Sequence, residues 1–136
     1  MTKSTPFILS IESDENCRLI LSKLLVQIMG FDKTQIWADS SDFLDRINEL
    51  PEVPQLVLLD INVAPLSGYK MLKLLHENAN FEKTKLVAFT AGVMPEEINN
   101  LKNAGFDSLI SKPIIRSNFP NIIKSIIDGQ SIWYIS

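Results

Sequence analysis

Four reactive side chains each follow a short apolar segment of the chain: Glu12, Asp60, Thr90 and Lys112. One carboxylate can act as a nucleophile, and a second can help to hold a hard divalent cation. A hydroxyl and an ammonium group can bind the oxygens of a phosphoryl group. If the four side chains meet, the chemistry they support best is transfer of a phosphoryl group to Asp60.

A parallel β-sheet would bring these side chains together. Residues 56–59, directly before Asp60, are all apolar, which is typical of a strand buried on both faces. In a parallel sheet covered by helices, the ligand site lies outside the carboxyl ends of the strands. Each of the four side chains stands at such an end, so we expect one shared crevice.

The hydrophobic pattern predicts five strands that alternate with five helices. The strands are predicted over residues 7–11, 35–38, 55–60, 85–90 and 108–111. The helices are predicted over residues 14–29, 40–50, 68–79, 95–104 and 117–128. Because each helix is long enough for a crossover, the strands should be parallel, and the chain should form a three-layer α/β domain.

Length and composition favour one small domain over residues 1–136, with a core over about 7–128 and a short apolar tail over 129–136. The 13 basic and 16 acidic residues include no basic run, so we expect no binding to nucleic acid or to an anionic membrane.

No apolar run is long enough to cross a bilayer, and the start of the chain leads into only a short apolar stretch. We therefore expect a cytoplasmic protein. Cys17 is the only cysteine, which excludes an internal disulfide.

Over about residues 7–128 the chain resembles the receiver domain of bacterial two-component response regulators. The resemblance rests on the acidic stretch after the first strand, on Asp60 with Gly68, on Thr90-Ala91 and on Lys112-Pro113. It implies a flavodoxin-like, doubly wound (βα)5 sheet with strand order 2-1-3-4-5. It also implies that Asp60 accepts a phosphoryl group from a histidine kinase or phosphotransfer protein with Mg²⁺ bound, that Thr90 and Lys112 assist, and that the Lys112–Pro113 bond is cis.

Three departures from the family pattern concern the metal and the switch. Relatives usually have two adjacent acids after the first strand, but here Glu12 is followed by Ser13, and Asp14 suits a helix cap better than a metal site. We therefore expect weakened Mg²⁺ binding, through Asp60, the backbone carbonyl of Asn62 and a water-mediated contact with Glu12. Leu109 replaces the usual aromatic residue three positions before the lysine. Ala64 and then Pro65 stand where relatives have proline four positions after the phosphoacceptor.

These observations predict a stand-alone receiver that is not an enzyme and that signals through contacts with an unknown downstream protein, as a monomer or homodimer. The expected contact surface is the fourth helix, fifth strand and fifth helix. One alternative is a pseudo-receiver that works without phosphorylation, which Ser13 and Leu109 favour. An aspartate-nucleophile phosphatase is a third, more distant interpretation, because such enzymes place a second Asp where this chain has Asn62. The apolar residues 132–135 should either fold back onto the domain, which we favour, or contact a partner.

Overall fold

The computed structural model describes residues 5–135 and forms a six-stranded parallel sheet. The strands are β1 (Ile8–Ile11), β2 (Gln35–Trp37), β3 (Leu56–Asp60), β4 (Lys85–Thr90), β5 (Ser108–Ser111) and β6 (Trp133–Tyr134). Their order across the sheet is β2-β1-β3-β4-β5-β6, which contains the expected order 2-1-3-4-5. Residues 1–4 and 136 of the expected domain, and with them most of the N-terminal stretch, lie outside the described residues.

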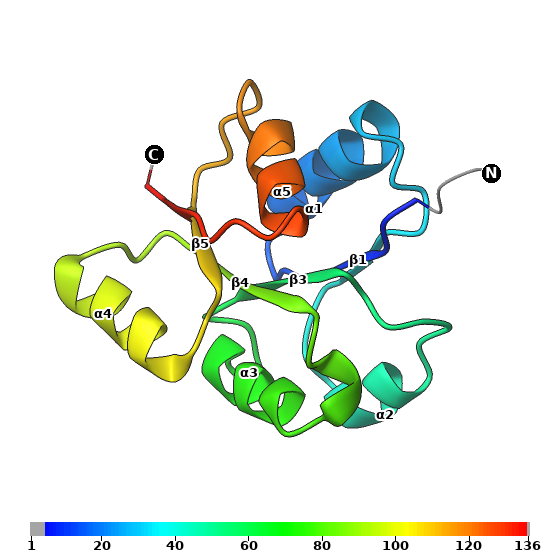
Figure 1. The fold of residues 1–136 in the computed structure, drawn as a ribbon, viewed down its shortest axis with the longest axis vertical. Coiled ribbons are helices and arrows are strands. Elements are labelled where there is room, and N and C mark those ends of the chain that lie inside the picture. Colours follow the sequence, from blue (N-terminus) through cyan, green and yellow to red (C-terminus); the bar gives the residue numbers. More distant parts are fainter. Residues whose placement is uncertain (1–4, 136) are drawn as a thin grey trace.

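Helices cover both faces of this sheet (Figure 1). They are α1 (Glu15–Ser22), the π-helix η1 (Lys23–Ile28), α2 (Phe43–Asn48), α3 (Gly68–His76), the 3₁₀-helix η2 (Ala79–Phe81), α4 (Pro95–Ala104) and α5 (Phe119–Ile127). In Figure 1, α1 and α5 lie above the sheet, and α2, α3 and α4 lie below it. Because helices lie on both faces of the sheet, the expected three-layer α/β architecture is confirmed. Among residues 5–135, no helix has the length and apolar character needed to span a bilayer.

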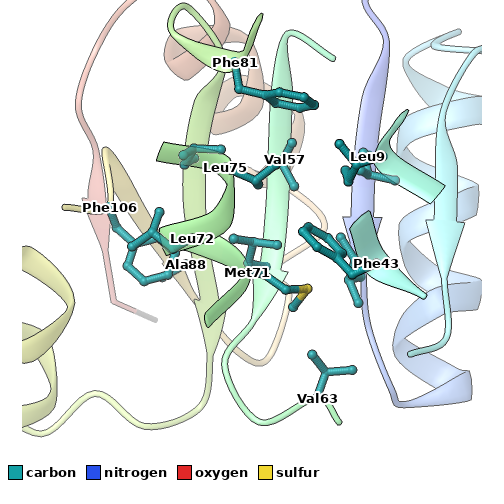
Figure 2. Close-up of a cluster of buried hydrophobic side chains, with 14 of the residues drawn as sticks. Leu9, Phe43, Val57, Val63, Met71, Leu72, Leu75, Phe81, Ala88 and Phe106 are labelled. Carbon is teal, nitrogen blue, oxygen red and sulfur yellow. The ribbon is translucent and has the colours of Figure 1, made fainter. Parts of the chain in front are cut away.

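Two apolar cores flank the sheet, because successive residues of a strand point to opposite faces. Val57 and Leu59 belong to the core beneath α2 and α3, whereas Leu56 and Leu58 belong to the core beneath α1 and α5. Figure 2 shows side chains of the first core: Leu9, Phe43, Val57, Met71, Leu72 and Leu75. Burial on both faces explains the unbroken apolar run that precedes Asp60.

The first helix differs from its predicted form in its second half. After Ser22 the chain continues as η1, and the Met29 N–H donates to the Leu24 carbonyl five residues earlier. The wider π-turn changes which side chains face the core. Leu24 and Leu25 are buried, but Ile28 is 69% exposed, although a period of 3.6 residues would place it on the same face.

Local chemistry sets the ends of two other helices. α2 begins at Phe43, later than the predicted start at residue 40, because Asp42 takes a left-handed conformation with φ of 51°. α4 has the predicted bounds, with a proline at its first position and Gly105 at its end with φ of 104°. A proline is favoured at the first helical turn, and glycine accepts the left-handed conformation that ends a helix.

The C-terminal segment folds back onto the domain, as favoured from the sequence, and forms a strand that was not predicted. β6 pairs in parallel with β5, placing Trp133 beside Leu109 and Tyr134 beside Ile110. The sheet therefore has a sixth strand beyond the five of the predicted (βα)5 arrangement. The edge of β5 within the expected contact surface is covered by β6.

Candidate functional site

The sheet delivers Asp60, Glu12, Thr90 and Lys112 to one edge, as predicted. Asp60 and Thr90 are the last residues of β3 and β4, and Glu12 and Lys112 directly follow β1 and β5. Glu12 is fully buried, and Asp60 is 3% exposed. Buried carboxylates are costly unless they are paired or hydrogen-bonded, so their partners define the site.

Lys112 is the cation that pairs with both carboxylates. Its Nζ lies 2.7 Å from Glu12 Oε1 and 3.7 Å from Asp60 Oδ2. The same Nζ lies 4.9 Å from the centroid of the Phe89 ring. Burial alone would lower the pKa of Lys112, but the hydrogen bond with Glu12 and the charges of Glu12 and Asp60 outweigh burial and raise that pKa above its ordinary value. Lys112 is therefore a firmly charged ammonium group at the edge of the sheet.

Asp60 is held by neutral donors as well as by Lys112. The Ser13 hydroxyl donates to Asp60 Oδ2 over 3.1 Å, and the Ser13 N–H lies 3.4 Å from the same oxygen. The Asn62 N–H donates to Asp60 Oδ1 over 3.1 Å. In the sequence Ser13 stands out as a missing acid, so the contact of Ser13 with Asp60 is a feature of the candidate site that sequence reasoning missed.

The loop that carries Ser13 is fixed by its neighbours. Asp14 accepts from the Cys17 N–H over 2.8 Å and caps α1, as predicted. Arg18 Nη1 donates to the backbone carbonyls of Glu12 and Ser13, over 3.0 and 2.7 Å. Glu12 Oε2 accepts from the Asp14 N–H over 2.8 Å. Asp14 is thus bound to its own helix, and among residues 5–135 Glu12 and Asp60 are the buried carboxylates.

Thr90 lies at the site, but its hydroxyl has a local partner. Thr90 Oγ1 accepts a hydrogen bond of 3.1 Å from the Gly92 N–H, in the loop that leads to α4. The hydroxyl therefore connects the end of β4 to this loop. A phosphoryl group that drew Thr90 toward Asp60 would disturb the bond with Gly92.

Gly68 has a structural role beside Asp60. A Cβ at this position would lie 2.8 Å from Ile61 Cα and 3.0 Å from the Asp60 carbonyl oxygen. The Gly68 N–H also donates to the Ile61 carbonyl over 3.0 Å. Gly68 thus permits α3 to approach the backbone that follows Asp60.

Cys17 has no sign of a reactive thiol. Burial, with a further contribution from the charge of Glu12, raises the pKa of Cys17 to about 12. The thiol therefore stays protonated near neutral pH and reacts slowly. A protonated, slowly reacting thiol agrees with a packing role for Cys17, which contacts the core beneath α1 and α5.

Comparison with known proteins decides the family. The profile described as "Response regulator receiver domain" matches residues 8–124. The chain belongs to the response regulator receiver domain family. As a receiver domain it is a module of phosphorelay signalling that pairs with a histidine kinase, and it is not an enzyme in the usual sense.

Similar proteins cover almost the whole receiver domain. The polar-differentiation response regulator DivK of Brucella ovis is 28% identical over 93% of this chain and 98% of its own length. The chemotaxis response regulator CheY4 of Vibrio cholerae has a TM-score of 0.80 at 17% identity, covering 90% of this chain and 99% of that chain. This likeness confirms the fold and strand order 2-1-3-4-5.

A third similar structure bears on the metal. The receiver domain of sensor histidine kinase PA1611 from Pseudomonas aeruginosa has a TM-score of 0.79 at 19% identity, and it covers 93% of this chain and all of that chain. That protein has a magnesium ion coordinated in its active site cleft. Within residues 5–135 of this chain, no three His, Cys, Asp or Glu side chains are grouped to hold a metal ion. Two buried carboxylates remain at the site, Glu12 and Asp60, and Mg²⁺ in proteins keeps several waters and commonly takes one or two carboxylates.

Proposed function

We propose that Asp60 is the phosphoacceptor of this receiver domain. The observation that carries the proposal is the convergence of Asp60 with the Lys112 ammonium group, 3.7 Å away, at the carboxyl ends of the strands. The second carboxylate, Glu12, holds Lys112 at 2.7 Å and thereby places its positive charge beside Asp60. A fixed cation next to a carboxylate is an arrangement that stabilises an incoming phosphoryl group.

The proposed reaction moves one phosphoryl group between two proteins. A carboxylate oxygen of Asp60 attacks the phosphorus of a phosphohistidine on the kinase or phosphotransfer protein. The new O–P bond forms an acyl phosphate as the P–N bond breaks, and the histidine nitrogen leaves with the electron pair of that bond. Lys112 binds the phosphoryl oxygens, and Thr90 adds its hydroxyl after releasing the Gly92 N–H.

The oxygen donors at this site suit Mg²⁺ as the cofactor. Asp60, the backbone carbonyl of Asn62 and, through water, Glu12 would hold it. Bound there, Mg²⁺ would neutralise charge on the transferring phosphoryl group. Ser13 supplies no carboxylate, so we expect weaker binding than in receivers with two adjacent acids.

The downstream partner would contact the side of the domain where α4, α5 and β6 meet. β6 carries Trp133 and Tyr134 along β5, so the tail forms part of the surface expected from the sequence. Lys102 of α4 lies 5.1 Å from the centroid of the Trp133 ring. A monomeric or homodimeric state and a cytoplasmic location stay predictions.

A phosphorylation-independent pseudo-receiver is the second candidate function, and the Ser13–Asp60 hydrogen bond favours it. A carboxylate already held by Ser13, Asn62 and Lys112 can serve as a fixed structural group. The phosphatase interpretation has less support, because the Asn62 side-chain amide cannot act as a general acid or base.

Intact-mass analysis after incubation with acetyl phosphate and Mg²⁺ tests the proposal. The natural protein should gain one phosphoryl group, and Asp60→Asn should gain none. Asp14→Asn is the matched control, because asparagine also caps a helix and the Asp14 carboxylate accepts from the Cys17 N–H of α1. A natural protein that stays unmodified with acetyl phosphate and with a competent kinase would favour the pseudo-receiver.

A further inference from the structure

Ser13 stands in a fixed loop and directs two donors at the carboxylate of Asp60. Its hydroxyl lies 3.1 Å from Asp60 Oδ2, and its N–H lies 3.4 Å from the same atom. Arg18 donates to the Ser13 carbonyl over 2.7 Å, so the loop has an anchor besides Asp60. The contact with Asp60 is therefore an additional feature of the side chain at position 13.

The two oxygens of Asp60 have different surroundings. Oδ2 faces the two donors of Ser13 and, at 3.7 Å, the ammonium group of Lys112. Oδ1 accepts the Asn62 N–H over 3.1 Å. A carboxylate oxygen has two lone pairs, and three donors already face Oδ2, so a divalent cation that approaches Oδ2 competes with these donors. The Ser13 hydroxyl, at 3.1 Å, is the nearest of the three.

We infer that Ser13 is a positioning residue that holds Asp60 without a metal, and that its hydroxyl competes with Mg²⁺ for Asp60. This inference deepens the proposed function and rests on it, because it assigns a role beside the phosphoacceptor. It goes further than the loss of an acid at position 13. A missing acid alone predicts weak Mg²⁺ binding whatever small residue replaces it, whereas competition predicts that the hydroxyl itself weakens binding.

Alanine at position 13 separates these two explanations. Ser13→Ala removes the hydroxyl and adds no charge, so under competition Mg²⁺ should bind about fivefold more tightly, the equivalent of one neutral hydrogen bond. Ser13→Thr keeps a hydroxyl and should bind Mg²⁺ like the natural protein. Ser13→Asp adds a carboxylate and should bind Mg²⁺ more tightly than Ser13→Ala or Ser13→Thr.

The measurement is a titration with MgCl₂ alone, followed by the amide chemical shifts of Ile61 and Asn62. Ser41→Ala is the matched control, because the Ser41 hydroxyl also donates to a carboxylate, Asp39 Oδ1 at 2.6 Å, outside this site. Its Mg²⁺ affinity should equal that of the natural protein. Unchanged or weaker binding in Ser13→Ala, absence of binding in both proteins, or no gain in Ser13→Asp would overturn the inference.

The titration contains no phosphoryl donor, so it is independent of the phosphorylation experiment. Tighter Mg²⁺ binding in Ser13→Ala without any phosphoryl adduct would leave the competition intact and remove the phosphoacceptor role of Asp60. A phosphoryl adduct on Asp60 together with unchanged Mg²⁺ binding in Ser13→Ala would support the phosphoacceptor role of Asp60 and remove the competition between Ser13 and Mg²⁺.

Discussion

The side-chain amide of Asn118 donates a hydrogen bond of 2.8 Å to the hydroxyl of Tyr134. Asn118 occupies the N-cap position of α5, where asparagine is a favoured residue, yet its side chain makes no capping hydrogen bond there. The contact with β6 thus uses a side chain that would otherwise suit the start of α5. The orientation of the amide that brings Nδ2 to Tyr134 leaves Oδ1, the atom that would cap α5, buried without a hydrogen-bond partner among the described residues. Docking of the tail and capping of α5 therefore compete for the orientation of Asn118.

This competition predicts unequal effects of two substitutions on the free energy of unfolding. Tyr134→Phe removes the hydroxyl but frees Asn118 to cap α5, so the net loss should be under about 0.5 kcal/mol. Asn118→Ala removes the hydrogen bond to Tyr134 and also the side chain that could cap α5 in its place, so it should cost about 1 kcal/mol. Urea unfolding measures both values. The double variant should match Asn118→Ala, and equal losses in the two single variants would contradict the competition.

A second prediction concerns the ion pair between Lys112 and Glu12. Lys112→Met leaves the fully buried Glu12 without a cation, which should lower the free energy of unfolding by about 3 kcal/mol at neutral pH. Adding Glu12→Gln should recover much of this loss. Lys33→Met is the matched control, because Lys33 and Glu52 form an exposed pair at 3.3 Å that should contribute under about 1 kcal/mol.

The raised pKa of Lys112 gives this prediction a pH dependence. A lysine whose pKa is higher in the folded protein adds stability below its ordinary value of 10.5 and loses that contribution as the pH rises through the folded value. The stability difference between the natural protein and Lys112→Met should therefore be constant from neutral pH to about pH 10 and shrink above it. A difference that shrank below pH 9 would contradict the assigned charge state.

The sequence predicts most of the sheet because its signals are local there. β4, α4 and β5 have the predicted bounds, set by apolar runs, by Pro95 and by Gly105. The π-turns of η1 and the left-handed Asp42 leave no mark in the hydrophobic period, so a period of 3.6 residues misplaces Ile28, and α2 begins later than predicted. β6 has only two residues, and its pairing depends on the free edge of β5, which no local pattern encodes.

The site shows the same division between local and tertiary information. Parallel strand ends fix the meeting of Asp60, Glu12 and Lys112, so these three could be predicted together. The hydrogen bond from Ser13 to Asp60 depends on how Arg18 orients the loop between β1 and α1. The bond from Gly92 to Thr90 depends on the turn after β4. Neither orientation can be deduced from residue types.

The last prediction concerns a signal that runs from the site to the tail. The Lys112 N–H donates to the Thr90 carbonyl over 2.9 Å, and Leu109, three residues earlier, lies beside Trp133 of β6. A movement of Thr90 or Lys112 toward a phosphoryl group should therefore shift β5 and change the surroundings of Trp133.

A few kcal/mol of bias between two conformations would be enough to produce that change, so a phosphoryl mimic should reveal it. The chain has two tryptophans, and Trp37→Phe leaves Trp133 as the only one. Beryllofluoride with Mg²⁺ should change the fluorescence of this variant and the amide shifts of residues 90–128. The same variant with Asp60→Asn is the control and should not respond, because it lacks the carboxylate that binds the mimic. If fluorescence and amide shifts both stay constant while beryllofluoride binds at Asp60, the domain does not switch through β5 and β6.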